Sequence, residues 1–329
     1  MKSNFSEFRF TPSMLAAPRL PGISAYMRIK NGAEFLRLAI ESHLPFYDEI
    51  IAVYNACTDN TEEILLTLQA QHPGKIKVFH YLPKVAKPCS EEHRQTPADS
   101  IHSMANYYNY ALSKARYSVA AKLDDDHLAI PCKLAPLVER IRADIAAGNL
   151  QVYTFSGPNV KKRDGVYLVG GGGPHPFCGN NDHQYHPVSP DYTYAQGHDC
   201  EIFRQPSQQQ VAREYMGIMF FHLKPLKQHS GYAYLDEPYR SLVTEQFINQ
   251  GLWLPWDEFC SPKARKRMIA DRPWGDRIQI ALYSMPAILN LRLKLVKKHP
   301  SLRKVRLARL RQDLAGIDFK RDLLDALEK

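Results

Sequence analysis

Three consecutive aspartates, Asp124, Asp125 and Asp126, follow directly after the apolar segment 117–123. That segment has the pattern of a buried strand, so the sequence predicts the three acids at the carboxyl end of a strand. Carboxylates packed together repel one another unless a cation or hydrogen-bond donors compensate their charge. A divalent ion such as Mg²⁺ or Mn²⁺ would do so and would share its ligands with substrate phosphates. The alternative is a solvated acidic turn that caps the next helix, and the three residues alone favour neither.

The elements that must position these acids follow from the apolar periodicity around them. Segments with the pattern of strands alternate with segments of helical spacing. The predicted strands are 22–28, 49–54, 75–80, 117–123 and 151–155, and the predicted helices are 33–43, 62–71, 100–114 and 133–147. Such alternation predicts a parallel sheet with helices on both faces, where ligands bind at the carboxyl ends of the strands. A hairpin is expected around residues 162–165.

Four blocks of the sequence carry recognisable motifs, namely 24–36 (first strand and K-N-E-A turn), 48–61 (second strand and N-x-S-T-D-x-T turn), Ala105-Asn106 (A-R-N helix) and 122–126 (D-x-D strand end). In their motifs and their order, these blocks resemble glycosyltransferase family 2. The sequence departs from the family at two positions, since Gly32 replaces the usual acid and Cys57 replaces the usual serine.

The resemblance implies an α/β protein of the GT-A type, with a Rossmann-like, mostly parallel central sheet flanked by helices and a basic helical extension at the C-terminal end. We expect a leader at 1–21 and a nucleotide-sugar-binding half at 22–130. An acceptor-binding half at 131–275 and the basic extension at 276–329 follow.

The resemblance also implies where the donor nucleotide and a Mg²⁺ or Mn²⁺ ion bind. The residues expected near the nucleotide-sugar are Arg28, Lys30, Asn31, Asn55, Asp59, Asn106, Asp124, Asp125, Lys224 and Lys227. Asp126 is expected on the metal, with Asp124 close to it and to the ribose. Asp59 has an alternative role, because an aspartate at this place can simply cap a helix.

The segment 216–227 resembles the H-x-K segment of several GT-A enzymes, in which the histidine joins the metal site. A lone histidine after an apolar segment is more often a packed residue. Here His222 is followed by Lys224 and Lys227, and a diphosphate leaving group needs positive charge as its bond breaks. We therefore expect His222 at the metal.

The segment 197–204 resembles the family's E-D-x-x-F helix start, where an acid is the catalytic base of inverting members. A single displacement needs a carboxylate that takes the proton from the acceptor hydroxyl. Asp199 is the first candidate and Glu201 the second. Alternatively, Asp199 only caps a helix that begins at Cys200.

The preceding loop is rich in polar and aromatic residues, namely His175, Asp182, His183, His186, Tyr192 and Tyr194. Their spacing matches no metal-binding motif. We expect the loop to bind the acceptor through rings that stack on sugars, with a packed irregular loop as the alternative.

The net charge of +9 favours anionic partners. Basic residues alternate with Leu and Val from Leu291 to Arg311, a pattern that fits either an anionic membrane surface or a helix packed on the core. The six scattered cysteines suggest neither disulfides nor zinc. We find no secretory signal or spanning segment, and expect a cytoplasmic protein, peripheral on the inner face of the membrane.

These observations predict an inverting, metal-dependent glycosyltransferase that moves a sugar from a UDP donor to a bacterial cell-surface glycan or glycolipid such as lipopolysaccharide or capsule. The rival is a basic nucleic-acid-binding protein or metal-dependent nuclease. Nucleic acid is disfavoured, because the basic residues follow the core and no helix-turn-helix, zinc or RNP signature occurs. A catalytically inactive sugar-binding homologue is disfavoured because the acids are present.

Overall fold

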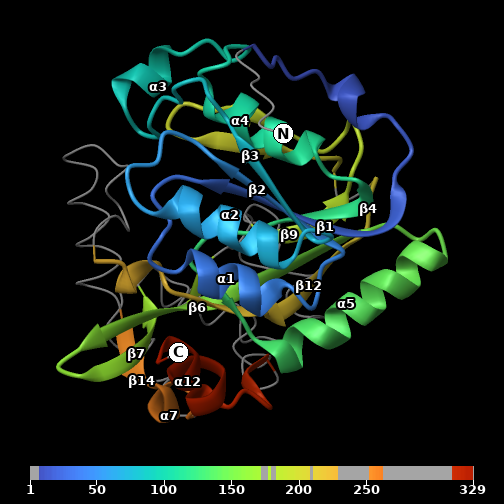
Figure 1. Cartoon of the computed structure of the whole chain (residues 1–329). Helices are drawn as coiled ribbons and strands as arrows, with labels where there is room; N and C mark the ends of the chain where they lie inside the picture. Colours follow the sequence, from blue (N-terminus) through green and yellow to red (C-terminus); the bar gives the residue numbers. More distant parts are fainter. Residues whose placement is uncertain are drawn as a thin grey trace, which may run out of the picture.

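The computed structural model describes residues 7–171, 177–178, 183–207, 210–228, 252–261 and 313–328. Its centre is a twelve-stranded mixed sheet whose main path runs β14-β7-β6-β9-β4-β1-β2-β3 (Figure 1). The half from β4 to β3 is parallel, as the sequence predicted, whereas β9 pairs antiparallel with both β4 and β6.

The parallel half follows the predicted alternation of strands and helices. Its elements are β1 (Leu20–Ile29), α1 (Leu36–His43), β2 (Glu49–Tyr54), α2 (Thr61–Gln71), β3 (Ile76–His80), α3 (Glu91–Gln95), α4 (Met104–Ser113) and β4 (Tyr117–Lys122). Ile29 pairs with Tyr54, and Tyr26 pairs with Lys122, so the carboxyl ends of β1, β2 and β4 meet at one edge. The turn Asp124–Asp126 follows β4 at that edge.

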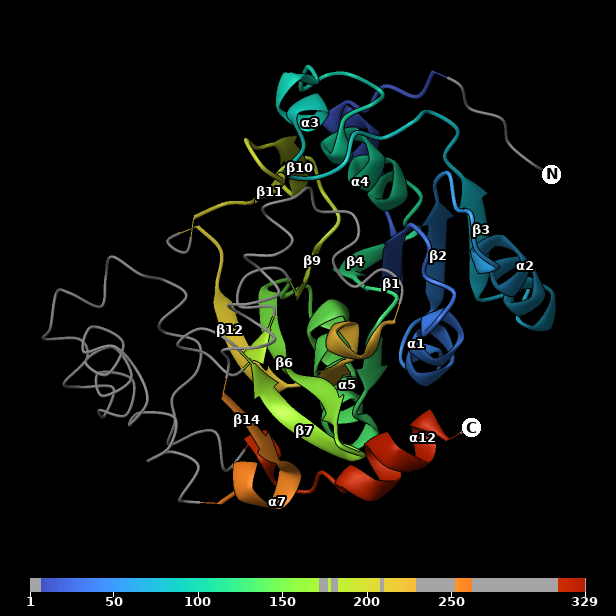
Figure 2. The same ribbon diagram turned by 90° about the vertical axis from the view of Figure 1, so that its left-hand side faces the viewer.

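Helices cover both faces of this half. Every residue of β2 is buried, as is typical of a central parallel strand. Ile23, Ala25 and Met27 of β1 pack in one cluster with α1, α2 and α5 (Pro131–Ala146), whereas Tyr26 packs with α4 in another. Figure 2 shows α2 and α4 on opposite sides of β2.

The second half is built around the long strand β6. Its strands are β5 (His127–Ala129), β6 (Val152–Arg163), β7 (Val166–Gly171), β8 (Phe177–Cys178), β9 (Gln184–Pro187), β12 (Arg213–Ile218), β13 (Phe220–His222) and β14 (Leu252–Pro255). The expected hairpin is confirmed, and Asp164 and Gly165 make its turn with positive φ angles. β6 extends beyond the predicted 151–155 because different partners pair with its two ends.

The predicted helix at Cys200 is wrong. Glu201–Arg204 forms β11, which pairs antiparallel with β10 (Thr193–Gln196) in a separate two-stranded sheet. Alternate side chains of β11 are exposed, a period of two that no helix has. Phe203 packs near Tyr194, so an aromatic contact from a non-adjacent segment stabilises the strand.

The two ends of the described chain pack on the core. Phe8 and Phe10 contact the cluster around α4, and Leu15 of the 3-10 turn η1 (Pro12–Leu15) is buried. Leu314 and Leu323 join the cluster around β6, near α7 (Trp256–Phe259), and the chain continues through η6 (Lys320–Leu324) and α12 (Asp325–Leu327). The basic segment 291–311 lies outside the described residues. Within these residues, no helix is long and apolar enough to cross a membrane.

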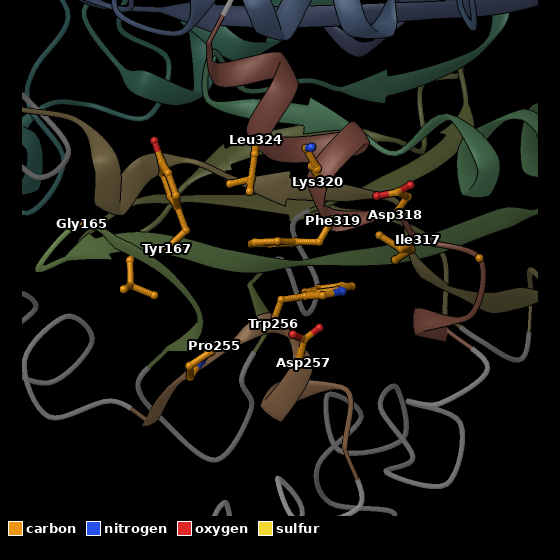
Figure 3. A pocket seen from close by; sticks show the side chains of 12 residues that line it. Gly165, Tyr167, Pro255, Trp256, Asp257, Ile317, Asp318, Phe319, Lys320 and Leu324 are labelled. Atoms are coloured by element: carbon orange, nitrogen blue, oxygen red, sulfur yellow. The ribbon is translucent and has the colours of Figure 1, made fainter.

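A cavity of about 890 Å³ lies beside this C-terminal segment (Figure 3). Residues of β7, α7 and the segment 316–324 line it, and none of them belongs to the aspartate turn. The rings of Trp256 and Phe319 stack there with centroids 4.8 Å apart. The two rings cover one face of each other, so those faces are closed to a ligand.

Candidate active site

The aspartate turn is held between two buried strands. The backbone N–H of Leu123 donates to Tyr26 O at 3.0 Å, which fixes the turn to β1, and β5 begins directly after it at His127. Asp126 is buried, with 4% of its surface exposed. The acids are therefore not a solvated surface turn, which was the alternative reading of the sequence.

Two lysines face the three carboxylates. Lys122 Nζ lies 3.4 Å from Asp124 Oδ2. Lys227 Nζ lies 2.9 Å from Asp125 Oδ2 and 2.8 Å from Asp126 Oδ2. If the nearby imidazoles are neutral, the three carboxylates and two ammonium groups together carry a net charge of about −1.

The lysines decide which carboxylates stay charged. Burial by itself raises the pKa of a carboxyl group. Burial is outweighed at Asp124 by Lys122 together with His127 and His183, and at Asp126 by Lys227 together with His222 and His127, so the pKa of each lies below its usual value. At Asp125 burial outweighs Lys227, and its pKa is raised. Asp124 and Asp126 are therefore the carboxylates best suited to binding a cation.

His222 reaches Asp126 through strand pairing. β13 runs antiparallel to β5, so that His222 pairs with His127. His222 Nδ1 lies 2.6 Å from Asn159 Oδ1, and its Nε2 lies 3.3 Å from Asp126 Oδ1. An amide oxygen accepts from an N–H group, so Asn159 keeps the proton on Nδ1 and leaves the lone pair of Nε2 toward Asp126.

His127 and His183 add two imidazoles. The ring of His127 stacks on Phe220 at 3.8 Å and meets the rings of His183 and His222 at 4.4 and 5.3 Å. Burial, followed by repulsion from the neighbouring His183, holds the pKa of His127 well below its usual value. His127 is therefore neutral at physiological pH, the form that binds metals.

These residues fit a divalent ion. The ligand atoms of Asp126, His127 and His222 lie within 4.8 Å of one another, and those of Asp124, His127 and His183 form a second such group. Asp126 Oδ1 and His127 Nε2 are buried without a hydrogen-bond partner, which is costly unless a ligand satisfies them. Asp126 and His222 were predicted at the metal from the sequence. His127 was not, although it directly follows the aspartates, and Asn159 has no local signal that would have revealed it.

Gly32 explains one departure from family 2. A Cβ atom at this position would clash with Asp125 Oδ2. The space that the usual acid would occupy is thus filled by the carboxylate of Asp125, which also accepts from Lys227 at 2.9 Å. The backbone N–H of Gln228 donates to both carboxylate oxygens of Glu34 and holds the segment after β13 against the same loop.

Three of the expected nucleotide residues join two loops at this edge of the sheet. Asn31, which has a positive φ, accepts from Thr58 N at 2.8 Å. Asp59 accepts from Ala33 N and Thr61 N at 3.0 and 3.1 Å, so it braces both loops and the start of α2. Lys30 Nζ donates to Ala56 O at 2.7 Å.

Asn55 and Asn106 are bound to the protein itself. Asn55 Nδ2 donates to Tyr81 O and Pro83 O at 2.6 and 2.8 Å. Asn106 Nδ2 donates to Phe8 O and to the Tyr81 hydroxyl, and its Oδ1 accepts from Phe10 N. The structure thus places Asn106 beside the N-terminal segment and not beside the aspartates.

Arg28 and Glu201 lie on the same side as the aspartates. Arg28 Cζ and Lys122 Nζ lie 5.0 and 5.6 Å from the centre of the Tyr108 ring. Burial opposes the charge on Arg28, but Tyr108 and Glu201 favour it, and its pKa lies above its usual value. The charges of Glu201 and Asp124 both raise the pKa of Tyr108.

Asp199 has a different neighbour. Its Oδ1 accepts from Arg94 Nε and Nη2 of α3 at 3.1 and 3.0 Å. Hydrogen bonds from His198 and Arg94 lower its pKa, which makes it a weaker base. Asp199 is also largely solvated, with 37% of its side chain exposed.

The remaining candidates are divided between the core and the surface. His186 accepts or donates at Nε2 with the Tyr26 hydroxyl at 3.2 Å, and its ring stacks on Tyr192 at 5.4 Å. Tyr194 stacks on Tyr108 at 4.4 Å. Lys224 begins the 3-10 turn η2 (Lys224–Leu226) and is partly exposed. His175 and Asp182 lie outside the described residues.

Residues 16–138 of the chain match the family model described as β-1,4-N-acetylgalactosaminyltransferase (CgtA). This match supports a glycosyltransferase, as the resemblance to family 2 implied. The match contains strands β1 to β4 and all three aspartates. Among proteins of curated function, none matches this chain.

Several solved structures are distantly similar. The first 349 residues of S. aureus TarS share 13% identity over 88% of this chain and 91% of that one, with a TM-score of 0.38. Two structures of glucosyl-3-phosphoglycerate synthase from Mycobacterium tuberculosis contain UDP and Mn²⁺. One shares 14% identity over 66% of this chain and 78% of that one, at a TM-score of 0.36. The other shares 16% identity over 41% of this chain and 43% of that one, at a TM-score of 0.29.

Proposed function

We propose that this glycosyltransferase moves a sugar from a nucleoside-diphosphate donor, with UDP as the nucleotide, in the presence of a divalent ion. The observation that carries the proposal is the partly buried turn Asp124–Asp126, whose negative charge exceeds that of the two lysines facing it. An anionic pocket repels a diphosphate unless a cation lies between them. Asp126 Oδ1, buried and without a hydrogen-bond partner, is where such a cation fits.

The chain's own residues would hold and balance the donor. When bound, the divalent ion would neutralise the diphosphate as its bond to the sugar breaks. Asp126 and His222 would hold that ion, and Asn159 keeps His222 in the required tautomer. Lys227, already anchored on the aspartates, and Lys224 three residues before it supply positive charge for the leaving diphosphate.

For the acceptor, we propose inversion by a single displacement with Glu201 as the base. The base must take the proton of the acceptor hydroxyl while that oxygen attacks the sugar. The charge of Glu201 acts on Arg28 and Tyr108, whereas Asp199 is bound by Arg94 and its pKa is lowered. We therefore reverse the order of the two candidates that the sequence suggested.

The family match suggests the donor sugar, and the basic segment suggests the location of the acceptor. The match to an N-acetylgalactosaminyltransferase family covers the half that we expect to bind the donor, and so makes UDP-N-acetylgalactosamine the first donor to test. We propose a bacterial cell-surface glycan or glycolipid, such as lipopolysaccharide or capsule, as acceptor. The basic segment 291–311 would bring the enzyme to an anionic membrane surface that carries such an acceptor.

Nucleotide binding is the most direct test. We expect UDP to raise the melting temperature only when Mn²⁺ is present, because a ligand that binds the native state stabilises it. GDP and CDP serve as matched controls for the base. Release of UDP from UDP-N-acetylgalactosamine would then establish donor use. The proposal is wrong if UDP binds equally well with Mn²⁺ and with EDTA.

A further inference from the structure

His127 is a buried histidine at the centre of both groups of possible ligands. Only 1% of its surface is exposed, and its Nε2 has no hydrogen-bond partner. Asp124 Oδ2 lies 3.8 Å from His127 Nε2, which is too far for a hydrogen bond. Asp126 Oδ1, the adjacent residue's oxygen, is also buried without a partner.

The position of the His127 ring is fixed by its neighbours. One face stacks on Phe220 with an interplanar angle of 23°, and the edges of His183 and His222 approach it. Pairing of β5 with β13 sets His127 opposite His222. A histidine held in this way is preorganised to bind a ligand through Nε2.

A cation satisfies this arrangement better than a water molecule does. Asn159 keeps the proton of His222 on Nδ1, so both His222 Nε2 and Asp126 Oδ1 offer lone pairs. The second oxygen of Asp126 is already bound by Lys227. A third lone pair comes from His127 Nε2 when its proton is on Nδ1. Three lone pairs exceed the two hydrogens of a water molecule, whereas one divalent ion accepts all three.

We propose that His127 is a direct ligand of the divalent ion, together with Asp126 and His222, and that the site prefers Mn²⁺, Co²⁺ or Zn²⁺ over Mg²⁺. This inference rests on the metal dependence proposed above and adds a ligand and a selectivity to it. Imidazole nitrogen binds transition-metal ions well, whereas Mg²⁺ prefers oxygen ligands and water. Two imidazoles and one carboxylate therefore disfavour Mg²⁺.

The test is pulsed electron paramagnetic resonance of Mn²⁺ bound to the full chain without nucleotide. We expect coupling to two imidazole nitrogens in the wild type and to one in His127→Gln. The affinity for Mn²⁺ should fall at least about 10- to 100-fold, the range already seen for loss of outer-shell partners. His43→Gln is the matched control, because His43 is also buried but lies in α1 and bonds Ala39 O. In the His43→Gln protein, Mn²⁺ should still couple to two imidazole nitrogens.

Two outcomes would overturn the assignment. One is a His127→Gln spectrum identical to that of the wild type. The other, which needs no variant and so does not depend on folding, is displacement of Mn²⁺ from the wild type by an equal concentration of Mg²⁺. If Mn²⁺ couples to both nitrogens but UDP never binds, the proposed donor chemistry fails while the ligand assignment stands. If UDP binds with Mn²⁺ but no second nitrogen couples, the ligand assignment fails while the proposed donor chemistry stands.

Discussion

Asn159 Oδ1 lies 2.6 Å from His222 Nδ1, and the two residues come from neighbouring parallel strands, β6 and β13. Through this hydrogen bond, a residue that never touches the aspartates sets which nitrogen of His222 carries the proton. Such partners of a ligating histidine raise its basicity and fix its orientation.

Replacing Asn159 by Ala should therefore weaken Mn²⁺-dependent UDP binding by about 10- to 100-fold. Asn159→Asp keeps an acceptor oxygen and should restore most of the affinity. Thr154→Val, at a buried position of the same strand, is the control. Calorimetry with UDP and Mn²⁺ measures all three variants. Equal affinities for the Ala and wild-type proteins would contradict this role for Asn159.

Asp126→Asn should abolish the Mn²⁺-dependent part of UDP binding. The substitution removes the charge of the best-placed carboxylate and leaves Lys227 with Asp125 alone. Asp164→Asn, in the exposed hairpin turn, should bind as the wild type does. An unchanged UDP affinity in Asp126→Asn, measured by calorimetry with Mn²⁺, would show that Asp126 holds no cation.

Glu201→Gln should lower sugar transfer by about 10² to 10⁴, the usual contribution of a general base, with little change in UDP affinity. Asp199→Asn should keep most of the activity, because Asp199 is occupied by Arg94. Initial rates at saturating donor separate the two variants. If the Asp199 variant loses transfer and the Glu201 variant does not, the assignment drawn from the sequence is restored.

Gly32→Ala should lower the free energy of unfolding by about 1–3 kcal/mol, because the new methyl group clashes with the Asp125 carboxylate. Gly74→Ala is the control, since nothing lies within 4 Å of a Cβ atom there. Adding Asp125→Ala should remove the clash, so the double variant should lose less than the sum of the single losses. Urea denaturation of the four proteins tests this coupling, and strictly additive losses would exclude it.

Stability should fall as the pH is lowered below about 6.5. Burial lowers the pKa of both His43 and His186 to about 4, whereas both protonate near pH 6.5 in the unfolded chain. The stabilisation from keeping them neutral is complete above that pH. Below it, each histidine costs about 1.4 kcal/mol per pH unit until the native pKa is reached. Urea denaturation from pH 7 to 5 should show a smaller loss for His43→Gln, and an equal loss would refute the assignment.

The parallel half of the fold could be predicted because its signals are local. Each strand of that half is a short apolar run followed by a turn and a helix of clear period, so the aspartates could be placed at the end of β4 from sequence alone. The helix expected at Cys200 failed because β11 depends on β10, a partner that local spacing does not reveal.

The site needed the structure for the same reason. His127 meets His222 only because β5 and β13 pair across 95 residues of chain, and Asn159 arrives from the middle of β6. Asn55 and Asn106 matched the family's motifs, yet their amides bind Tyr81 and the N-terminal segment. A sequence motif identifies a residue, but the contacts of its side chain depend on segments that are distant in the sequence.

The close approach of Gly32 to Asp125 also constrains how this enzyme and its relatives can diverge. Where family 2 usually has an acid, this chain has no side chain, and the carboxylate arrives from the strand end instead. Positions 32 and 125 should therefore covary in an alignment of homologues, with an acid at one and a small residue at the other. An ancestor could exchange the two only through an intermediate that carries two small residues, because two acids would collide there.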